Sequence, residues 1–195
     1  MIAIIDYKAG NIASVVNALK RLGILDYQIV NRPLDLKKAA KIIFPGVGRA
    51  APAMLHLKKQ GLDSAIKEIR VPFLGICLGQ HLLAEFSYED KVDCLGIIPG
   101  KVRKLPSSVK IPQIGWNKVS FKKKSPLLSG IPNKSYFYFV NSYYFDAQDS
   151  FALGKTNYGI EFPSIVQKEN FYATQFHPEK SSRWGSKLLQ NFCEL

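Results

Sequence analysis

Through the first half of the chain, short apolar runs alternate with stretches of helical spacing. Residues 2–5 form a continuous apolar run that ends at an acid, and residues 11–22 repeat apolar side chains every three or four positions before stopping at Gly23. Further strands are predicted at 27–30, 42–44 and 72–76, and further helices at 51–59, 62–69 and 78–86. This alternation predicts a parallel sheet covered by helices on both faces.

From about residue 95 onward the pattern changes to strand after strand. Predicted strands lie at 101–105, 116–121, 136–145, 151–156, 164–167 and 171–176. A final helix at 182–192 places Trp184, Leu188, Leu189 and Phe192 on one face. Since no repeat or linker interrupts the chain, we expect one domain over residues 1–195. The expected fold is three-layer α/β, with a mainly parallel central sheet, helices on both faces and additional strands in the C-terminal half.

The composition is that of an ordinary globular domain. The chain has 195 residues, of which 47% are hydrophobic and 22% charged, and this excludes a disordered or fibrous protein. No apolar stretch approaches the roughly 18 residues of a membrane span, and the first residues contain no basic leader. The three cysteines lack metal-ligand spacing and suit a reducing compartment. We therefore expect a cytoplasmic protein with no membrane segment, metal or cofactor.

A net charge of +12 raises the question of nucleic-acid binding. The basic residues are dispersed, and the densest run, 122–124, is followed by Ser125-Pro126, as in a surface loop. We therefore expect a lysine-rich solvated surface and no nucleic-acid partner. A docking face for an acidic partner or a phosphorylated substrate remains an alternative.

Candidate chemistry begins with a cysteine between a strand and a helix. Cys77 follows an apolar run, precedes a helical stretch, and has Gly75 and Gly79 two residues to either side. This arrangement is typical of a nucleophile elbow, a sharp turn that presents one side chain at the carboxyl edge of the sheet. Since a helix N-terminus favours a thiolate, we expect an exposed, reactive Cys77. The alternative is an ordinary buried cysteine.

A thiolate nucleophile needs a base, and His177 is the best candidate of three histidines. It follows the strand at 171–176, so it belongs at the same sheet edge as Cys77, whereas His56 reads as a helix-surface residue. In extended chain, residues two apart point the same way, so Glu179 is expected to accept a hydrogen bond from the His177 ring. Together they form a nucleophile, base and orienting acid in the order Cys, His, Glu.

A glycine turn supplies a candidate oxyanion hole. Residues 45–48, Pro-Gly-Val-Gly, follow the strand at 42–44, and their backbone N–H groups are little obstructed by side chains. Together with the N–H of Leu78 they are placed to meet a developing negative charge. Taken alone, the segment is equally compatible with an ordinary turn.

Three segments together resemble the class I (triad) glutamine amidotransferases: 45–48 (PGVG), 75–79 (GICLG) and 176–181 (FHPEKS). Further segments are similar to the glutaminase subunits of imidazole glycerol phosphate synthases, in histidine biosynthesis: Asp6-Tyr7, Gly10-Asn11, and 115–117, 139–143 and 158–162. The resemblance spans the whole chain. It implies a class I amidotransferase fold with a flavodoxin-like core, and release of ammonia from glutamine.

The resemblance also implies roles for individual residues. Cys77, His177 and Glu179 would be the triad, with Gly46, Val47 and Leu78 around the oxyanion. The residues that would bind glutamine are Gly48, His81, Glu89, Ser142 and Tyr143. Ammonia would pass to a (β/α)₈ barrel cyclase subunit, contacted by Asn11, Trp116 and Lys180. The chain departs from the family around the pocket, with Gln80-His81 in place of Met-Gln and Asn141 in place of a histidine.

Four other functions are considered. The same glutaminase could serve a surface-sugar amidation pathway. Failure to rescue a histidine auxotroph that lacks this subunit would favour that pathway over histidine biosynthesis. The glutaminase of pyridoxal phosphate synthesis also ends in His-Pro-Glu but lacks the segments at 115–117 and 140–143. A catalytically silent binding module on the same fold predicts no alkylation of Cys77 by a glutamine mimic. Nucleic-acid binding would require strongly salt-dependent affinity.

Overall fold

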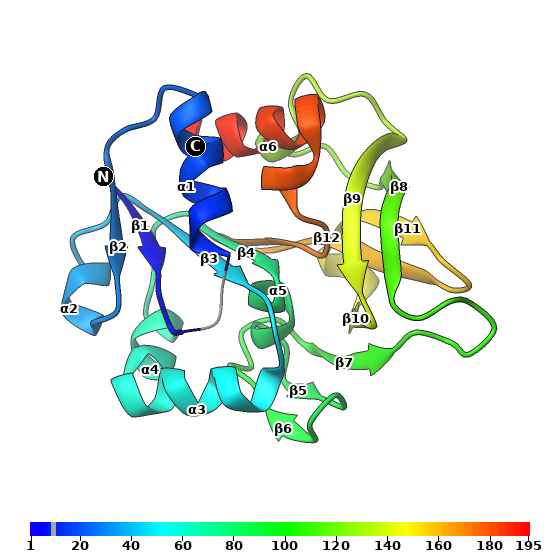
Figure 1. Cartoon of the computed structure of the whole chain (residues 1–195), viewed down its shortest axis with the longest axis horizontal. Helices are drawn as coiled ribbons and strands as arrows, with labels where there is room; N and C mark the ends of the chain where they lie inside the picture. Colours follow the sequence, from blue (N-terminus) through cyan, green and yellow to red (C-terminus); the bar gives the residue numbers. More distant parts are fainter. Residues whose placement is uncertain (9–10) are drawn as a thin grey trace.

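The computed structural model describes residues 1–8 and 11–195. Gly10, one of the residues in the resemblance above, lies outside this described part. Figure 1 shows a central sheet with helices packed against it and the more strand-rich half of the chain at one side.

Within the described residues, nine strands form the main sheet, in the order β2-β1-β3-β4-β13-β12-β11-β8-β9. The first five, β2 (Tyr27–Val30), β1 (Ile2–Ile5), β3 (Lys41–Gly46), β4 (Phe73–Cys77) and β13 (Phe171–Thr174), pair in parallel. The remaining pairings are antiparallel and involve β12 (Glu161–Lys168), β11 (Ala152–Asn157), β8 (Gln113–Phe121) and β9 (Ser135–Asn141). The parallel part has the strand order of flavodoxin-like folds.

A second sheet of four strands lies beside the first. Its order is β10-β7-β5-β6, with bounds β10 (Tyr143–Ala147), β7 (Gly100–Lys104), β5 (Phe86–Ser87) and β6 (Val92–Asp93). The two sheets are joined through the chain at Ser142, where β9 ends and β10 begins.

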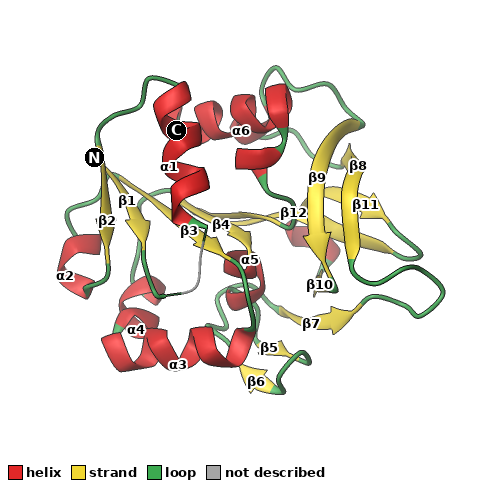
Figure 2. Ribbon diagram, in the orientation of Figure 1, coloured by secondary structure: helices red, strands yellow, loops and turns green. Residues whose placement is uncertain are grey.

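Helices cover both faces of the main sheet and close two apolar cores (Figure 2). One core contains apolar residues of α2 (Pro33–Leu36), α3 (Ala50–Gln60), α4 (Leu62–Lys67) and α5 (Leu78–Leu82). The other contains those of α1 (Ile12–Arg21) and α6 (Ser182–Glu194). Short 3₁₀ turns lie at η1 (Pro126–Leu128), η2 (Asp149–Phe151) and η3 (Pro178–Lys180). The three-layer α/β fold is thereby confirmed.

Local sequence explains where two of the helices begin or end. Asn11 caps α1, since its side chain accepts a hydrogen bond from the Ser14 N–H at 3.2 Å, and basic residues lie in the last turn of the helix. Helix α3 stops at Gly61, whose φ of 67° lies in the left-handed region that glycine adopts without strain. No helix in the described ranges is long and apolar enough to cross a membrane.

Three details of the predicted elements are wrong. The helix expected at 78–86 ends at Leu82, because N–H groups of the loop at 95–97 bond the carbonyls of Leu82, Leu83 and Ala84. The strand expected at 136–145 is two strands in different sheets, broken at Ser142. Helix α2 and the short β5–β6 pair were not predicted. Contacts that are remote in sequence fix these boundaries, and apolar periodicity does not record them.

Close backbone packing at Gly79 yields a first prediction. A Cβ added there would lie 2.0 Å from the Phe44 carbonyl oxygen, so Gly79→Ala should destabilise the protein by on the order of 3 kcal/mol. Gly23→Ala is the matched control: its Cβ meets nothing within 4 Å, and only the positive φ of 75° opposes it, at about 1 kcal/mol. Urea unfolding of both variants measures the difference, and equal losses would contradict the packing argument.

Candidate active site

The turn between β4 and α5 has the strained geometry of a nucleophile elbow. Cys77 adopts φ 54° and ψ −106°, a region that side-chain-bearing residues rarely occupy. The flanking glycines make the turn possible, since a Cβ on Gly75 would lie 2.8 Å from the Gly79 carbonyl oxygen. The glycines noted in the sequence therefore serve close backbone approach.

Cys77 is less exposed than the sequence suggested. Only 8% of its surface is accessible, which corrects the expectation of an exposed thiol. The turn directs it into a cavity of about 340 Å³ rather than to open solvent. The cavity is lined by Val47, Gly48, Cys77, Leu78, His81, Glu89, Pro112, Val140, Asn141, Ser142, Tyr143, His177 and Lys180. A largely buried thiol that faces a cavity lined by both apolar and polar side chains is placed for chemistry on a small molecule.

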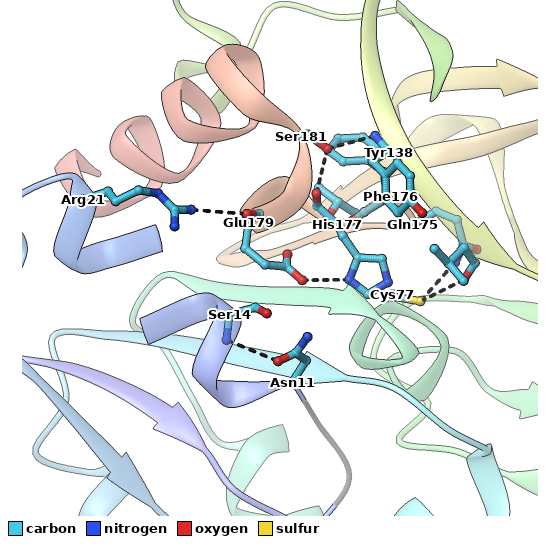
Figure 3. A network of polar contacts seen from close by, with 12 residues as sticks. Asn11, Ser14, Arg21, Cys77, Tyr138, Gln175, Phe176, His177, Glu179 and Ser181 are labelled. Atoms are coloured by element: carbon cyan, nitrogen blue, oxygen red, sulfur yellow. Dashed lines mark hydrogen bonds and ion pairs between the residues drawn. The ribbon is translucent and has the colours of Figure 1, made fainter. Parts of the chain in front are cut away.

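His177 lies between Cys77 and Glu179 (Figure 3). The His177 Nδ1 and the Glu179 Oε1 are 2.8 Å apart, and both side chains are buried. The contact is as expected, but the expected extended backbone is wrong. Glu179 lies in the 3₁₀ turn η3. The tight turn brings the carboxylate to Nδ1 at the edge of the ring.

The η3 turn is anchored by contacts with distant elements. Ser181 donates a hydrogen bond to the His177 carbonyl at 2.6 Å and accepts one from the Tyr138 N–H at 2.9 Å. The His177 N–H in turn donates to the Tyr138 carbonyl. Arg21 of α1 reaches the Glu179 carbonyl from the other side (Figure 3). These bonds fix the position of the imidazole relative to β9.

Electrostatics at His177 favours a charged imidazole ring. Burial opposes a charged imidazole, yet the neighbouring Cys77 and the Glu179 carboxylate outweigh it and raise the pKa of His177 well above its usual value. The charged imidazole that this shift favours lies beside the Cys77 sulfur. Nδ1 then donates to Glu179 and Nε2 remains for the cavity side.

The residues expected around the oxyanion lie next to Cys77. Gly46 is directly opposite Cys77 in the β3–β4 register, and Val47 and Leu78 line the cavity. Gly46 itself is packed, since an added Cβ would lie 2.4 Å from the Tyr7 hydroxyl. The turn and the start of α5 thus place backbone N–H groups near the sulfur.

All five residues expected to bind glutamine line the cavity: Gly48, His81, Glu89, Ser142 and Tyr143. Ser142 and Tyr143 come from the point where the two sheets meet. The Glu89 carboxylate accepts a hydrogen bond from the Ala50 N–H, and burial raises its pKa. The cavity wall therefore combines a carboxylate, a hydroxyl and glycine backbone, groups suited to an amino acid.

The three residues expected at a partner interface lie in different surroundings. Lys180 is exposed and also lines the cavity. Trp116 is 51% exposed and packs edge-on against Tyr138. Asn11 caps α1.

Two contacts of the Cys77 sulfur were not predicted from the sequence. Gln175 is fully buried and contacts two cavity residues, the Cys77 sulfur at 3.9 Å and His81 Nε2 at 2.8 Å. Val140 contributes its carbonyl oxygen, 3.8 Å from the same sulfur. The signal for Gln175 was present, because it lies two residues before His177 and alternation places both on one side of a strand.

Comparison with known sequences decides the family. The chain matches the family described as "Glutamine amidotransferase class-I" over residues 3–195. It is a class I glutamine amidotransferase.

Similar curated proteins match over full length. The chain is 48% identical over 197 residues to "Imidazole glycerol phosphate synthase subunit HisH" of Bacteroides fragilis (strain YCH46), covering 100% of this chain and 99% of the relative. It is 47% identical over 202 residues to "Imidazole glycerol phosphate synthase subunit HisH 1" of Campylobacter jejuni (strain 81-176), with both chains fully covered. The resemblance to the glutaminase subunits of imidazole glycerol phosphate synthases is confirmed.

Solved structures share the fold at low identity. One titled as a glutamine amidotransferase superposes with a TM-score of 0.76 at 19% identity, covering 100% of this chain and 98% of the other. PurLQS from Thermotoga maritima gives 0.74 at 16% identity, covering 99% and 97%. These likenesses support the amidotransferase fold.

His81 gives this amidotransferase an acid-sensitive element. Burial lowers the pKa of His81 to about 4, only partly opposed by its bond to Gln175. Because the folded-state pKa lies below the unfolded 6.5, stability present above pH 6.5 is lost as the pH falls toward 4. The loss should reach about 3 kcal/mol at pH 4.

The matched variant is His81→Gln, which keeps an amide beside Gln175 but does not titrate in this range. Urea unfolding between pH 7 and pH 4 should show a smaller stability loss for the variant than for the wild type, by about that amount. Parallel curves would mean that folding does not lower the pKa of His81.

Proposed function

We propose that this amidotransferase is the glutaminase subunit of an imidazole glycerol phosphate synthase, acting in histidine biosynthesis as a single domain over residues 1–195. The full-length identity of 44–48% to subunits of that name supports the assignment. The observation that carries the chemistry is the placement of His177 between the Cys77 sulfur and the Glu179 carboxylate at one cavity.

The first half of the reaction forms a thioester. The Cys77 thiolate attacks the side-chain carbonyl carbon of glutamine, and the negative charge moves to the carbonyl oxygen. Backbone N–H groups at Gly46, Val47 and Leu78 stabilise this oxyanion. When the tetrahedral intermediate collapses, the C–N bond breaks, the His177 imidazolium gives its proton to the leaving nitrogen, and ammonia departs.

The second half releases glutamate. Neutral His177 takes a proton from water, whose oxygen attacks the thioester carbon, and a second oxyanion forms at the same backbone groups. Collapse breaks the C–S bond and restores the thiolate beside the imidazolium. The part of Glu179 is to hold the ring and stabilise its charge.

Substrate recognition is assigned to the remaining cavity residues. Glu89 offers a carboxylate to the α-ammonium group of glutamine, while Gly48, Ser142 and Tyr143 offer hydrogen bonds to its polar groups. His81, uncharged at neutral pH, occupies the wall beside the sulfur.

The ammonia acceptor lies on a partner. We assign this partner as a (β/α)₈ barrel cyclase that turns a phosphoribosyl-aminoimidazole intermediate into imidazole glycerol phosphate and aminoimidazole carboxamide ribotide. Exposed Trp116 and Lys180, with Asn11, are assigned to the interface, where Ile114 and Val140 add exposed apolar surface. Free thiols and a free amino-acid substrate suit the cytoplasm.

Substitution of the triad tests the chemistry. Cys77→Ser should abolish glutamine hydrolysis without unfolding the protein, since the change is one atom. Glu179→Gln should lower kcat by about 10²- to 10⁴-fold while KM changes little, because the ring loses its partner but remains. Steady-state assays with the cognate barrel present measure both. Surviving hydrolysis in Cys77→Ser, or no alkylation of wild-type Cys77 by a glutamine-like electrophile, would identify a silent module.

Complementation tests the pathway. A histidine auxotroph that lacks its own glutaminase subunit, supplied with this chain and the cognate barrel, should grow without histidine. Cys77→Ser supplied in the same way should not support growth when ammonia is scarce. Active glutaminase without rescue would assign the chain to another amidation pathway, such as one for surface sugars.

A further inference from the structure

A buried amide connects the nucleophile to His81. Gln175 is fully buried between the two, with Nε2 3.9 Å from the Cys77 Sγ and Oε1 2.8 Å from the His81 Nε2. Its backbone is fixed as well, because the Gln175 N–H donates to the Ser164 carbonyl at 2.9 Å. The side chain therefore has little freedom except to exchange the places of its amide oxygen and nitrogen.

The two amide orientations differ in what they present to the sulfur. With Oε1 toward His81, the amide N–H groups face the Cys77 sulfur and stabilise a thiolate. With the amide reversed, a carbonyl oxygen faces the thiolate, and the two negative atoms repel. The ring of His81 decides between them: when Nε2 carries the hydrogen it donates to Oε1 and holds the amide in the first orientation.

We propose that Gln175 is a positioning residue that presents its amide N–H to the Cys77 thiolate, and that His81 acts through Gln175 by holding the amide in that orientation. The inference rests on the proposed function of Cys77. It gives His81 a part that direct contact with glutamine does not explain. It also gives a reason for a buried, neutral histidine on α5.

Other groups near the sulfur have different parts. Among the described residues, the ionisable groups that face Cys77 or share its cavity are His177, Glu179, Tyr7, Tyr143, His81, Glu89 and Lys180. Of these, His177 supplies the positive charge, and the Val140 carbonyl accepts from the thiol form at 3.8 Å. The Gln175 amide is thus a donor that favours the ionised sulfur without itself titrating.

Alkylation of Cys77 in the absence of glutamine tests the proposal without relying on glutaminase activity. The rate of reaction with iodoacetamide, followed at Cys77 by peptide mass spectrometry across pH 5–10, reports the thiolate fraction. Gln175→Met keeps the length of the side chain and removes the N–H. It should move the rate profile to higher pH by about one unit and slow alkylation about tenfold below the midpoint.

Variants of His81 test whether it acts on the sulfur through Gln175. His81→Leu frees the amide to turn and should move the profile in the same direction, and the double variant Gln175→Met with His81→Leu should move it no further. His81→Gln again donates an N–H to Oε1 and should restore the wild-type profile. Matched controls are Gln190→Met on the exposed side of α6 and His56→Leu on α3, which should leave the profile unchanged.

Several outcomes would overturn the proposal. A wild-type profile in folded Gln175→Met would show that the amide does not stabilise the thiolate. An unchanged profile in His81→Leu, with a raised KM for glutamine, would make His81 a substrate contact only. Circular dichroism verifies folding. If Gln175→Met does not fold, Gln175→Glu replaces it. This variant puts a carboxylate oxygen at the sulfur and should slow alkylation. If the wild type does not hydrolyse glutamine but the alkylation profiles are as expected, the proposed function is refuted and the role of Gln175 and His81 is not.

Discussion

The backbone at Cys77 is the constraint on which the rest of the site depends. A residue with a side chain is held at φ 54° and ψ −106°, and such strain costs on the order of 1–3 kcal/mol. It persists because β4 is paired on both sides, with β3 and β13, and because the start of α5 packs directly onto β3 at Gly79. The sulfur consequently faces the cavity that His177 and the turn after β3 also line.

Parallel pairing explains how residues a hundred positions apart meet. Strands β4 and β13 are neighbours in register, so the segments that follow them emerge at the same edge of the sheet. One segment begins with the nucleophile, and the other carries Gln175, His177 and Glu179. The register of this strand pair thereby brings the Cys77 sulfur, the Gln175 amide and the His177 imidazole to one place.

Much of this arrangement could be predicted from sequence because it is encoded locally. The alternation of strand and helix, the glycines around Cys77 and the His-Pro-Glu segment were each recognisable from a few neighbouring residues. The end of α5 and the break at Ser142 could not be predicted, since bonds from the loop at 95–97 and pairing with β7 determine them. The burial of Cys77 and the second contact of Gln175 likewise depend on side chains brought together only by the fold.

The chain leaves the large sheet at Ser142 and enters the small one. Residues on both sides of this point, Asn141 and Tyr143, line the cavity. The groups proposed to break bonds lie at the end of β4 and just after β13, whereas Ser142 and Tyr143, two of the residues proposed to bind the substrate, lie at the junction beyond β9. The small sheet and its loops can accordingly change in sequence or length, and so fit a different amide, while the geometry around Cys77 stays the same. Selectivity and reactivity are in this way separable properties of one compact molecule.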